Sequence, residues 1–111
     1  MIFVFEVRVR PGHDAEEYAE AWIEASRIIQ SHAGAQGTRL HRMIGRSDRL
    51  LAIARWESKA ARDDAEGRRD PRVQAILDEQ ARYVDVEIIG EFNEPEWVVW
   101  PPGDESPERS E

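Results

Sequence analysis

The stretch Thr38 to Trp56 constrains the fold of this chain most strongly. Two runs there alternate apolar and polar residues, and a polar Gly-Arg-Ser-Asp segment at positions 45–48 separates them. Because side chains on a strand point alternately to the two faces of a sheet, this pattern is typical of a β-hairpin. We therefore predict two antiparallel strands that meet at this turn.

The remaining elements follow from the same kind of periodicity. Apolar positions repeat every two residues in strands and every three to four in helices, while Pro, Gly, Asp and Ser mark the ends of elements. The elements predicted in this way are strands over residues 2–10 and 83–92, and helices over residues 14–31, over residues 59–65 and from residue 70 onward. Asp14, Ser58 and Asp70 are the predicted N-caps.

The order β-α-β-β-α-β predicts an α+β, ferredoxin-like fold, with one antiparallel sheet and its helices on one face. The other face still carries apolar residues such as Ile2 and Val4. A second copy of the sheet is the simplest cover for them, so we expect a homodimer. We expect the domain to span residues 1–94, followed by an apolar arm or extra strand over residues 95–102 and a disordered tail over residues 103–111.

Composition limits the classes of partner. The 111-residue chain is 41% hydrophobic and 34% charged, with a net charge of -8. An acidic chain without a basic stripe is a poor nucleic-acid binder. No apolar run reaches the roughly 20 residues of a membrane helix, and no signal peptide is recognisable, so we expect a cytoplasmic protein with no membrane partner.

Specific cofactor motifs are also missing from the sequence. There are no cysteines, which excludes disulfides and thiolate ligands. The His and Glu residues do not follow metal-ligand spacings such as H-x-x-x-H or E-x-x-H, and no Gly-rich phosphate loop follows a strand. We therefore expect neither a metal site nor a nucleotide cofactor.

Several features together resemble the antibiotic biosynthesis monooxygenase family, within the dimeric α+β barrel group. The resemblance covers residues 1–92. It rests on the opening strand with Pro11-Gly12, the helix with Trp22, the Gly37-x-x-Leu40 entry to the hairpin, and the run R-W-E-S-K-A-A from Arg55 to Ala61. The resemblance implies two sheets that face each other across a dimer, with a pocket between sheet and helices in each subunit. Some members oxygenate phenols, quinols or polyketide anthrones without metal or flavin, and others bind and degrade haem.

The chain departs from the haem-degrading branch of that family. Where that branch carries an Asn, a Trp and a His, this chain has Phe5, Ala65 and either Ile76 or Leu77, which leaves no axial ligand. The resemblance therefore disfavours haem degradation. It implies a cofactor-independent monooxygenase that acts on a small aromatic, quinol or polyketide-like substrate, and the alternative is a non-catalytic ligand-binding or stress-related homodimer of the same fold.

The candidate catalytic residues are His41, Arg39 and Asp64. His41 could remove or orient a phenolic proton, and Arg39 could stabilise the resulting anion. Alternatively, His41 faces the dimer surface, and Arg39 and Arg55 pair with acidic residues on neighbouring strands. Asp64 stands where many monooxygenase-like members of the family carry a His, so it is either a base or a solvated helix residue.

Four aromatic side chains are candidates for substrate binding: Trp22, Trp56, Phe5 and Tyr83. They could wall a pocket for a planar ring, but large aromatics at these spacings also fill a core. His13 and His32 lie at predicted helix ends, and we interpret them as capping or solvent-exposed residues.

Overall fold

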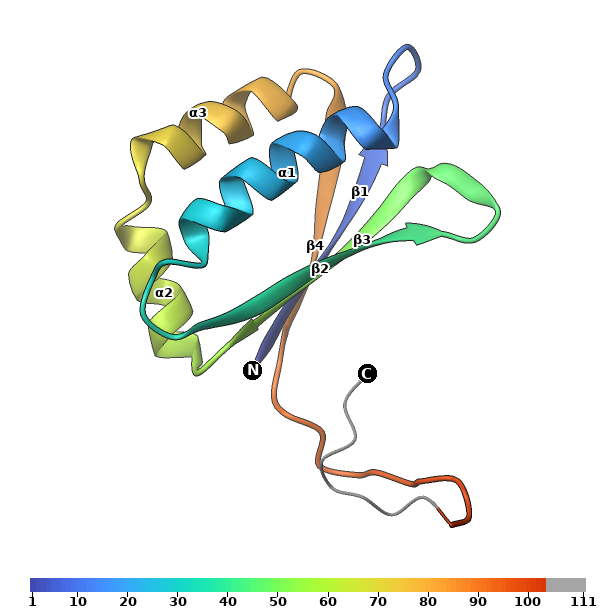
Figure 1. The fold of residues 1–111 in the computed structure, drawn as a ribbon, viewed down its shortest axis with the longest axis vertical. Coiled ribbons are helices and arrows are strands. Elements are labelled where there is room, and N and C mark those ends of the chain that lie inside the picture. Colours follow the sequence, from blue (N-terminus) through green and yellow to red (C-terminus); the bar gives the residue numbers. More distant parts are fainter. Residues whose placement is uncertain (104–111) are drawn as a thin grey trace.

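The computed structural model describes residues 1–103, in which one antiparallel sheet carries three helices on one of its faces (Figure 1). The strands lie in the order β2-β3-β1-β4, and every neighbouring pair is antiparallel. This confirms the predicted α+β, ferredoxin-like fold. The elements in chain order are β1 (Ile2–Val9), α1 (Ala15–Ile29), β2 (Ala35–Met43), β3 (Arg46–Trp56), α2 (Lys59–Gly67), α3 (Pro71–Gln80) and β4 (Val84–Phe92).

Short polar residues begin each helix, as the sequence predicts. Asp14, Ser58 and Asp70 have extended backbones, and the side chain of each accepts a hydrogen bond from a backbone N–H two or three residues further on. Glu17, whose backbone N–H bonds Asp14, places its carboxylate 3.0 Å from His13 Nδ1. None of the helices in the described part of the chain is long and apolar enough to span a membrane.

The predicted hairpin is present, but its turn lies earlier than expected. Met43 of β2 pairs with Arg46 of β3, so the turn consists of Ile44 and Gly45 rather than residues 45–48. Gly45 has a φ of 85°, a conformation that other residues rarely adopt, and this places the reversal there. The pairing of β2 with β3 then shifts in register, because Met43 pairs with Arg46 whereas Arg42 pairs with Leu50, and residues 47–49 are skipped.

The core lies between the sheet and α1. Period-two alternation places one face of β1 toward the helices, as predicted, and apolar residues of α1, of β3 and of β4 with the residue before it pack on this face. Its buried members are Val7, Val9, Ala15, Tyr18, Leu50, Tyr83 and Val84. The packing is incomplete further along the same face, because Val86 and Ile88 of β4 keep 54% and 65% of their surface exposed.

The opposite face of the sheet carries no helix of the described chain (Figure 1). Cross-strand pairs on this face include Val4 with Ile53 and Ile2 with Arg55. After β4 the chain leaves the sheet as an arm without regular secondary structure, in which Trp97 and Val99 are 86% and 94% exposed. Of the tail predicted over residues 103–111, residues 104–111 lie outside the described part.

We predict that an Asp70→Asn variant reveals how much of the contribution of the α3 cap to stability comes from its negative charge, because asparagine has nearly the same shape as aspartate but no charge. Hydrogen bonds from the Arg72 side chain and backbone N–H lower the pKa of Asp70 to about 2. A carboxylate with a lowered folded-state pKa stabilises the fold above its unfolded pKa, near pH 4, and loses that contribution as the pH falls toward about 2. Denaturant unfolding at a series of pH values should therefore show a stability difference from wild type that is constant above about pH 5 and vanishes below about pH 2. A difference independent of pH would contradict the role given to the charge.

Candidate functional site

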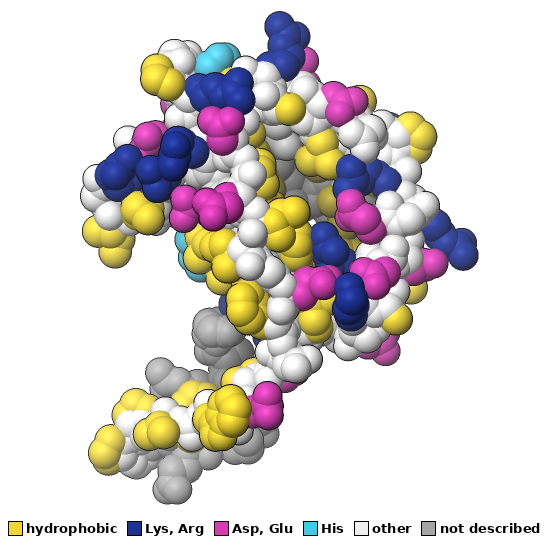
Figure 2. All heavy atoms as spheres, turned by 180° about the vertical axis from the view of Figure 1, so that it is seen from behind, with side chains coloured by type: hydrophobic (Ala, Val, Ile, Leu, Met, Phe, Trp, Pro, Cys, Tyr) yellow, Lys and Arg dark blue, Asp and Glu magenta, His cyan; other side chains and the backbone are white. Residues whose placement is uncertain are grey.

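A cavity of about 680 Å³ lies between the sheet and the helices. Figure 2 shows a hollow that is lined by hydrophobic side chains and rimmed by basic and acidic side chains. Small residues leave part of this space open, since Ala25 and Ser26 of α1 and Ala54 of β3 are among the residues that line it. The volume falls within the range of small-molecule sites.

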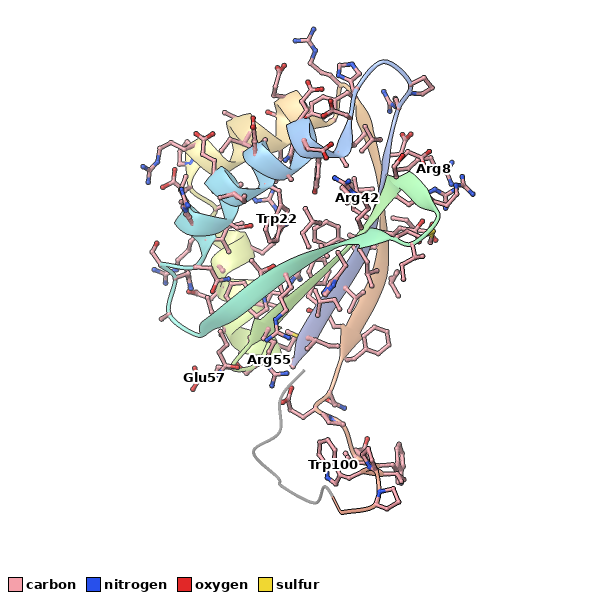
Figure 3. The ribbon with its side chains drawn as sticks, turned by 45° about the vertical axis from the view of Figure 1, so that its right-hand side comes forward. Arg8, Trp22, Arg42, Arg55, Glu57 and Trp100 are labelled. Atoms are coloured by element: carbon pink, nitrogen blue, oxygen red, sulfur yellow. The ribbon has the colours of Figure 1, made fainter. Side chains whose placement is uncertain are left out.

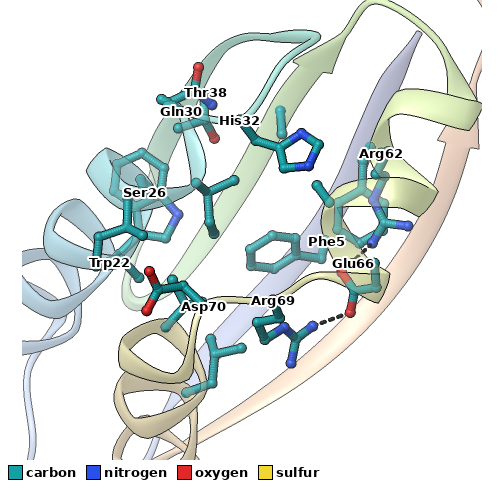
Figure 4. Close-up of a pocket in the computed structure, with 18 of the residues that line it drawn as sticks. Phe5, Trp22, Ser26, Gln30, His32, Thr38, Arg62, Glu66, Arg69 and Asp70 are labelled. Carbon is teal, nitrogen blue, oxygen red and sulfur yellow. Dashed lines mark hydrogen bonds and ion pairs between the residues drawn. The ribbon is translucent and has the colours of Figure 1, made fainter.

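Aromatic side chains form much of the cavity wall. Phe3 and Phe5 extend from β1 with their ring centroids 5.6 Å apart, and Trp22 points from α1 toward the sheet (Figures 3 and 4). Trp56 closes the end of β3 and is only 4% exposed. These side chains offer flat apolar surfaces to a planar ring.

Of the four aromatic residues proposed from the sequence, the structure places Trp22, Trp56 and Phe5 on the cavity and Tyr83 elsewhere. Tyr83 is buried in the core just before β4, and its ring stacks on His13 at 4.8 Å. It precedes β4 by one residue, so it lies at the end of the sheet where α1 begins rather than beside the cavity.

Helix α2 and the start of α3 supply a charged wall. The Arg62 guanidinium lies 3.7 Å above the Phe3 ring and also binds Glu91 of β4 at 3.3 Å. Glu66 forms an ion pair with Arg69 (Figure 4). The Arg62–Glu91 pair joins α2 to β4 at the edge of the sheet, whereas the Glu66–Arg69 pair joins α2 to the segment before α3.

Tyr18 contributes a buried phenol to the cavity. Burial raises its pKa well above the usual value for tyrosine, with a smaller contribution from Tyr83. Tyr18 is therefore neutral near pH 7.

His32, which we predicted to be a capping or solvent-exposed residue, follows α1 and also lines the cavity. Its side chain is 25% exposed and lies in the connection between α1 and β2. Its Nε2 atom is 3.1 Å from the carboxylate of Asp64, and its Nδ1 atom is 2.9 Å from the carbonyl oxygen of Ala33. The His32 and Trp56 rings pack edge-on, with their centroids 6.4 Å apart. No spacing in the sequence indicates the pair with Asp64, because only the packing of α2 against this connection brings the two side chains together.

Close packing at Gly34 holds the His32 connection against α2. Gly34 has a φ of 91°, and a Cβ atom at this position would lie 2.5 Å from the Cβ of Ala61. Its carbonyl oxygen accepts a hydrogen bond from Glu57 N at 2.8 Å. Glycine is needed here both for its backbone conformation and for the absence of a side chain.

The candidate catalytic residues of β2 lie away from the cavity. Arg39 and His41 pair with Ile53 and Leu51 on the sheet face that no helix covers, and both are exposed. Successive side chains of a strand point to opposite faces of the sheet. Because Thr38 lines the cavity, Arg39 and His41 lie on the other face. The geometry therefore gives His41 and Arg39 no contact with a ligand in this cavity, whereas Asp64 reaches its edge through His32.

Arg55 does not form the cross-strand pairs expected for it. It forms an ion pair with Glu94, at the root of the arm (Figure 3). Two acidic residues of the neighbouring strands pair with other arginines, Glu6 with Arg49 and Asp85 with Arg10. Within residues 1–103, no group of three or more His, Asp or Glu side chains is arranged to hold a metal ion.

Comparison with known proteins places this architecture in a family. Residues 1–77 match the family described as antibiotic biosynthesis monooxygenase. The chain belongs to this family. No curated protein matches the sequence.

Solved structures of low sequence identity share the fold. SnoaB from Streptomyces nogalater, described as a cofactor-independent oxygenase, superposes with a TM-score of 0.75 at 16% identity, over 87% of this chain and 94% of SnoaB. A candidate antibiotic biosynthesis monooxygenase from Deinococcus radiodurans superposes with a TM-score of 0.70 at 11% identity, over 91% of this chain and 100% of that protein. Rv0793 from Mycobacterium tuberculosis superposes with a TM-score of 0.62 at 13% identity, over 84% of this chain and 96% of Rv0793.

We predict that Gly34→Ala destabilises the protein more than Gly12→Ala, which is its matched control. Both glycines have a φ near 90°, but no atom lies within 4 Å of a Cβ built on Gly12. Gly12→Ala should cost about 1 kcal/mol of unfolding free energy through backbone strain, and Gly34→Ala about 2–4 kcal/mol because the clash with Ala61 adds to it. Urea unfolding of the two variants measures the difference, and equal losses would mean that the contact with α2 is not tight.

Proposed function

We propose that this protein is a cofactor-independent monooxygenase whose substrate is a small, planar, electron-rich aromatic molecule, such as a phenol, a quinol or a polyketide-like compound. The observation that carries the proposal is the aromatic-walled cavity of about 680 Å³ in a member of the antibiotic biosynthesis monooxygenase family. Trp22, Trp56 and Phe5 would hold the ring. The shared fold with SnoaB is consistent with this proposal.

The proposed reaction takes its electrons from the substrate. Once a phenol or enol is ionised, its ring can donate electrons to O2. Oxidation of a ring CH2 to C=O then takes one oxygen atom into the product and releases the other as water, which balances atoms and electrons without a reductant. The protein would exclude bulk water, orient the ring and stabilise the anion.

A non-catalytic ligand-binding protein of the same fold is the second candidate. It is favoured by the position of His41 and Arg39 outside the cavity and by the pairing of the charged groups on the α2 wall. In that case the same cavity would bind an aromatic ligand without consuming O2.

We also propose that the protein is a cytoplasmic homodimer that buries the uncovered sheet face. Ile2 and Ile53 lie on this face partly exposed, and Phe92, which pairs with Ile2, keeps 46% of its surface exposed. Trp97 in the arm is 86% exposed, a large apolar area for a single side chain. Burial against a second copy would remove both surfaces from water.

We predict that wild-type protein consumes O2 when mixed with an anthrone or quinol, and that Val86→Trp abolishes this. Val86 lines the cavity and is half-exposed, so a larger ring there should occupy ligand space without disturbing the core. An oxygen electrode measures the reaction, and calorimetry with the same compound measures binding. Ala60→Trp, on the exposed surface of α2, is the control and should leave both unchanged. Binding without O2 uptake by the wild type would select the second candidate, and absence of both would reject the proposal.

We predict that deletion of residues 95–111 weakens the dimer, because it removes the exposed apolar side chains of the arm. Ile53→Glu should weaken it further by placing a charge on the uncovered face. Sedimentation velocity at micromolar protein gives the mass in each case. A wild-type protein that sediments as a monomer would rule out the dimer, and an unchanged dimer after the deletion would show that the arm does not contribute.

A further inference from the structure

We propose that the ligand of the cavity is a fused-ring aromatic ketone or quinone, whose oxygen atoms accept hydrogen bonds from a row of uncharged side chains along α1. The row consists of Trp22, Ser26 and Gln30. The inference rests on the proposed function, because it names the class of ligand that binds in the same cavity. It favours compounds with several oxygen atoms on one edge over simple phenols and quinols.

The three residues of the row share one side of α1. Trp22 and Ser26 lie within the helix, and Gln30 is its C-cap residue with a helical backbone. Residues four positions apart lie one above the other on a helix, about 6 Å apart along its axis. All three line the cavity, and Figure 4 shows them along one wall, with Phe5 on the opposite side. Tyr18, one turn earlier in the same row, also lines the cavity but is buried in the core, so the row begins at the closed end.

The donors of this row lack partners in the protein. Within residues 1–103, neither Trp22 Nε1 nor Ser26 Oγ forms a hydrogen bond with another protein atom. Gln30 Oε1 accepts a hydrogen bond from Gly37 N at 2.7 Å, which orients the amide and leaves its NH2 group as a donor. All three side chains are half-buried, and polar groups in such positions are usually hydrogen-bonded, because leaving them without a partner costs free energy. Oxygen atoms of a ligand in the cavity would supply these partners.

The charged residues that line the cavity belong to a different wall. They come from α2 and from the segment before α3, and each of them has an oppositely charged partner. The pairs are Arg62 with Glu91, Glu66 with Arg69, Arg68 with Asp64, and Asp70 with Arg72. The unpaired donors of the cavity therefore lie on the uncharged wall, where they match the neutral carbonyl and hydroxyl oxygens of a ligand.

The spacing of the row limits the shape of the ligand. Donors about 6 Å apart along the helix axis can bind oxygen atoms on neighbouring rings of a fused system, whereas a single-ring phenol offers one oxygen to one donor. The indole N–H of Trp22 can donate from its edge, while Phe5 and Trp56 offer apolar surfaces to the rings. A ligand that spans the row is held with the same edge toward α1, which fixes its orientation in the cavity.

Calorimetry with 1,8-dihydroxyanthraquinone tests the inference. This quinone carries neighbouring oxygen atoms along one edge of its fused rings and lacks the ring CH2 that the proposed reaction oxidises, so binding is measured without turnover. Ser26→Ala should weaken binding about fivefold, because one neutral hydrogen bond is lost. Gln30→Glu keeps an oxygen for the Gly37 N–H but removes the NH2 donors, and it should weaken binding at least as much. Binding of naphthalene, which has no oxygen, should be the same in both variants.

Ser47→Ala and Gln36→Glu are the matched controls. Ser47 in β3 and Gln36 in β2 are exposed and do not line the cavity, so these variants should bind the quinone as the wild type does. A second probe, 1-naphthol, has a single oxygen and cannot reach both donors at once. It should therefore lose affinity in no more than one of the variants Ser26→Ala and Gln30→Glu.

The outcomes that overturn the inference differ in what they mean for the proposed function. If the wild type binds the quinone and naphthalene but neither row variant weakens quinone binding, the row does not bind oxygen, and the oxygenase proposal stands. The same holds if the variants weaken naphthalene as much as the quinone, because the row then only shapes the wall. Equal losses of 1-naphthol in both variants would reject a ligand that extends along the row. If no aromatic probe binds to the wild type, both the inference and the proposed function are rejected.

Discussion

The register between β1 and β3 is the constraint on which the rest of the structure depends. Phe3 pairs with Ala54 and Phe5 with Ala52, so the aromatic side chains of β1 and the small side chains of β3 share the helix-facing side. A slip of one residue would exchange the two faces of β3 and bring Ile53 and Arg55 under the helices. The cavity therefore exists because large residues on one central strand lie beside alanines on the next.

The same arrangement divides the sheet into a packed part and an open part. Toward the end of β1, Val7 and Val9 meet Tyr18 and the core is closed. Toward its beginning, the helices stand further from the sheet, α2 is tied to β4 through Glu91, and the space between remains open. The cavity thus costs packing at one end, while the other end supplies the buried apolar surface that stabilises the domain.

Electrostatics at the open end depend on close contact between two segments. Gly34 lets the α1–β2 connection approach Ala61 of α2, and this contact brings the imidazole of His32 to the carboxylate of Asp64. A side chain at position 34 would push the two segments apart. The polarity of the proposed site is therefore controlled by backbone packing outside the cavity as well as by the residues that line it.

Periodicity and end signals in the sequence determined the element order, the N-caps and the face of β1 that meets the helices. These are local properties, because strand alternation and capping depend on residues a few positions apart. The tertiary structure decided the turn at Gly45, the position of Tyr83 in the core and the location of His41 and Arg39 on the uncovered face. It also decided the pairing of His32 with Asp64, which no local pattern encodes, because side chains 32 positions apart meet only when a helix packs against a distant connection.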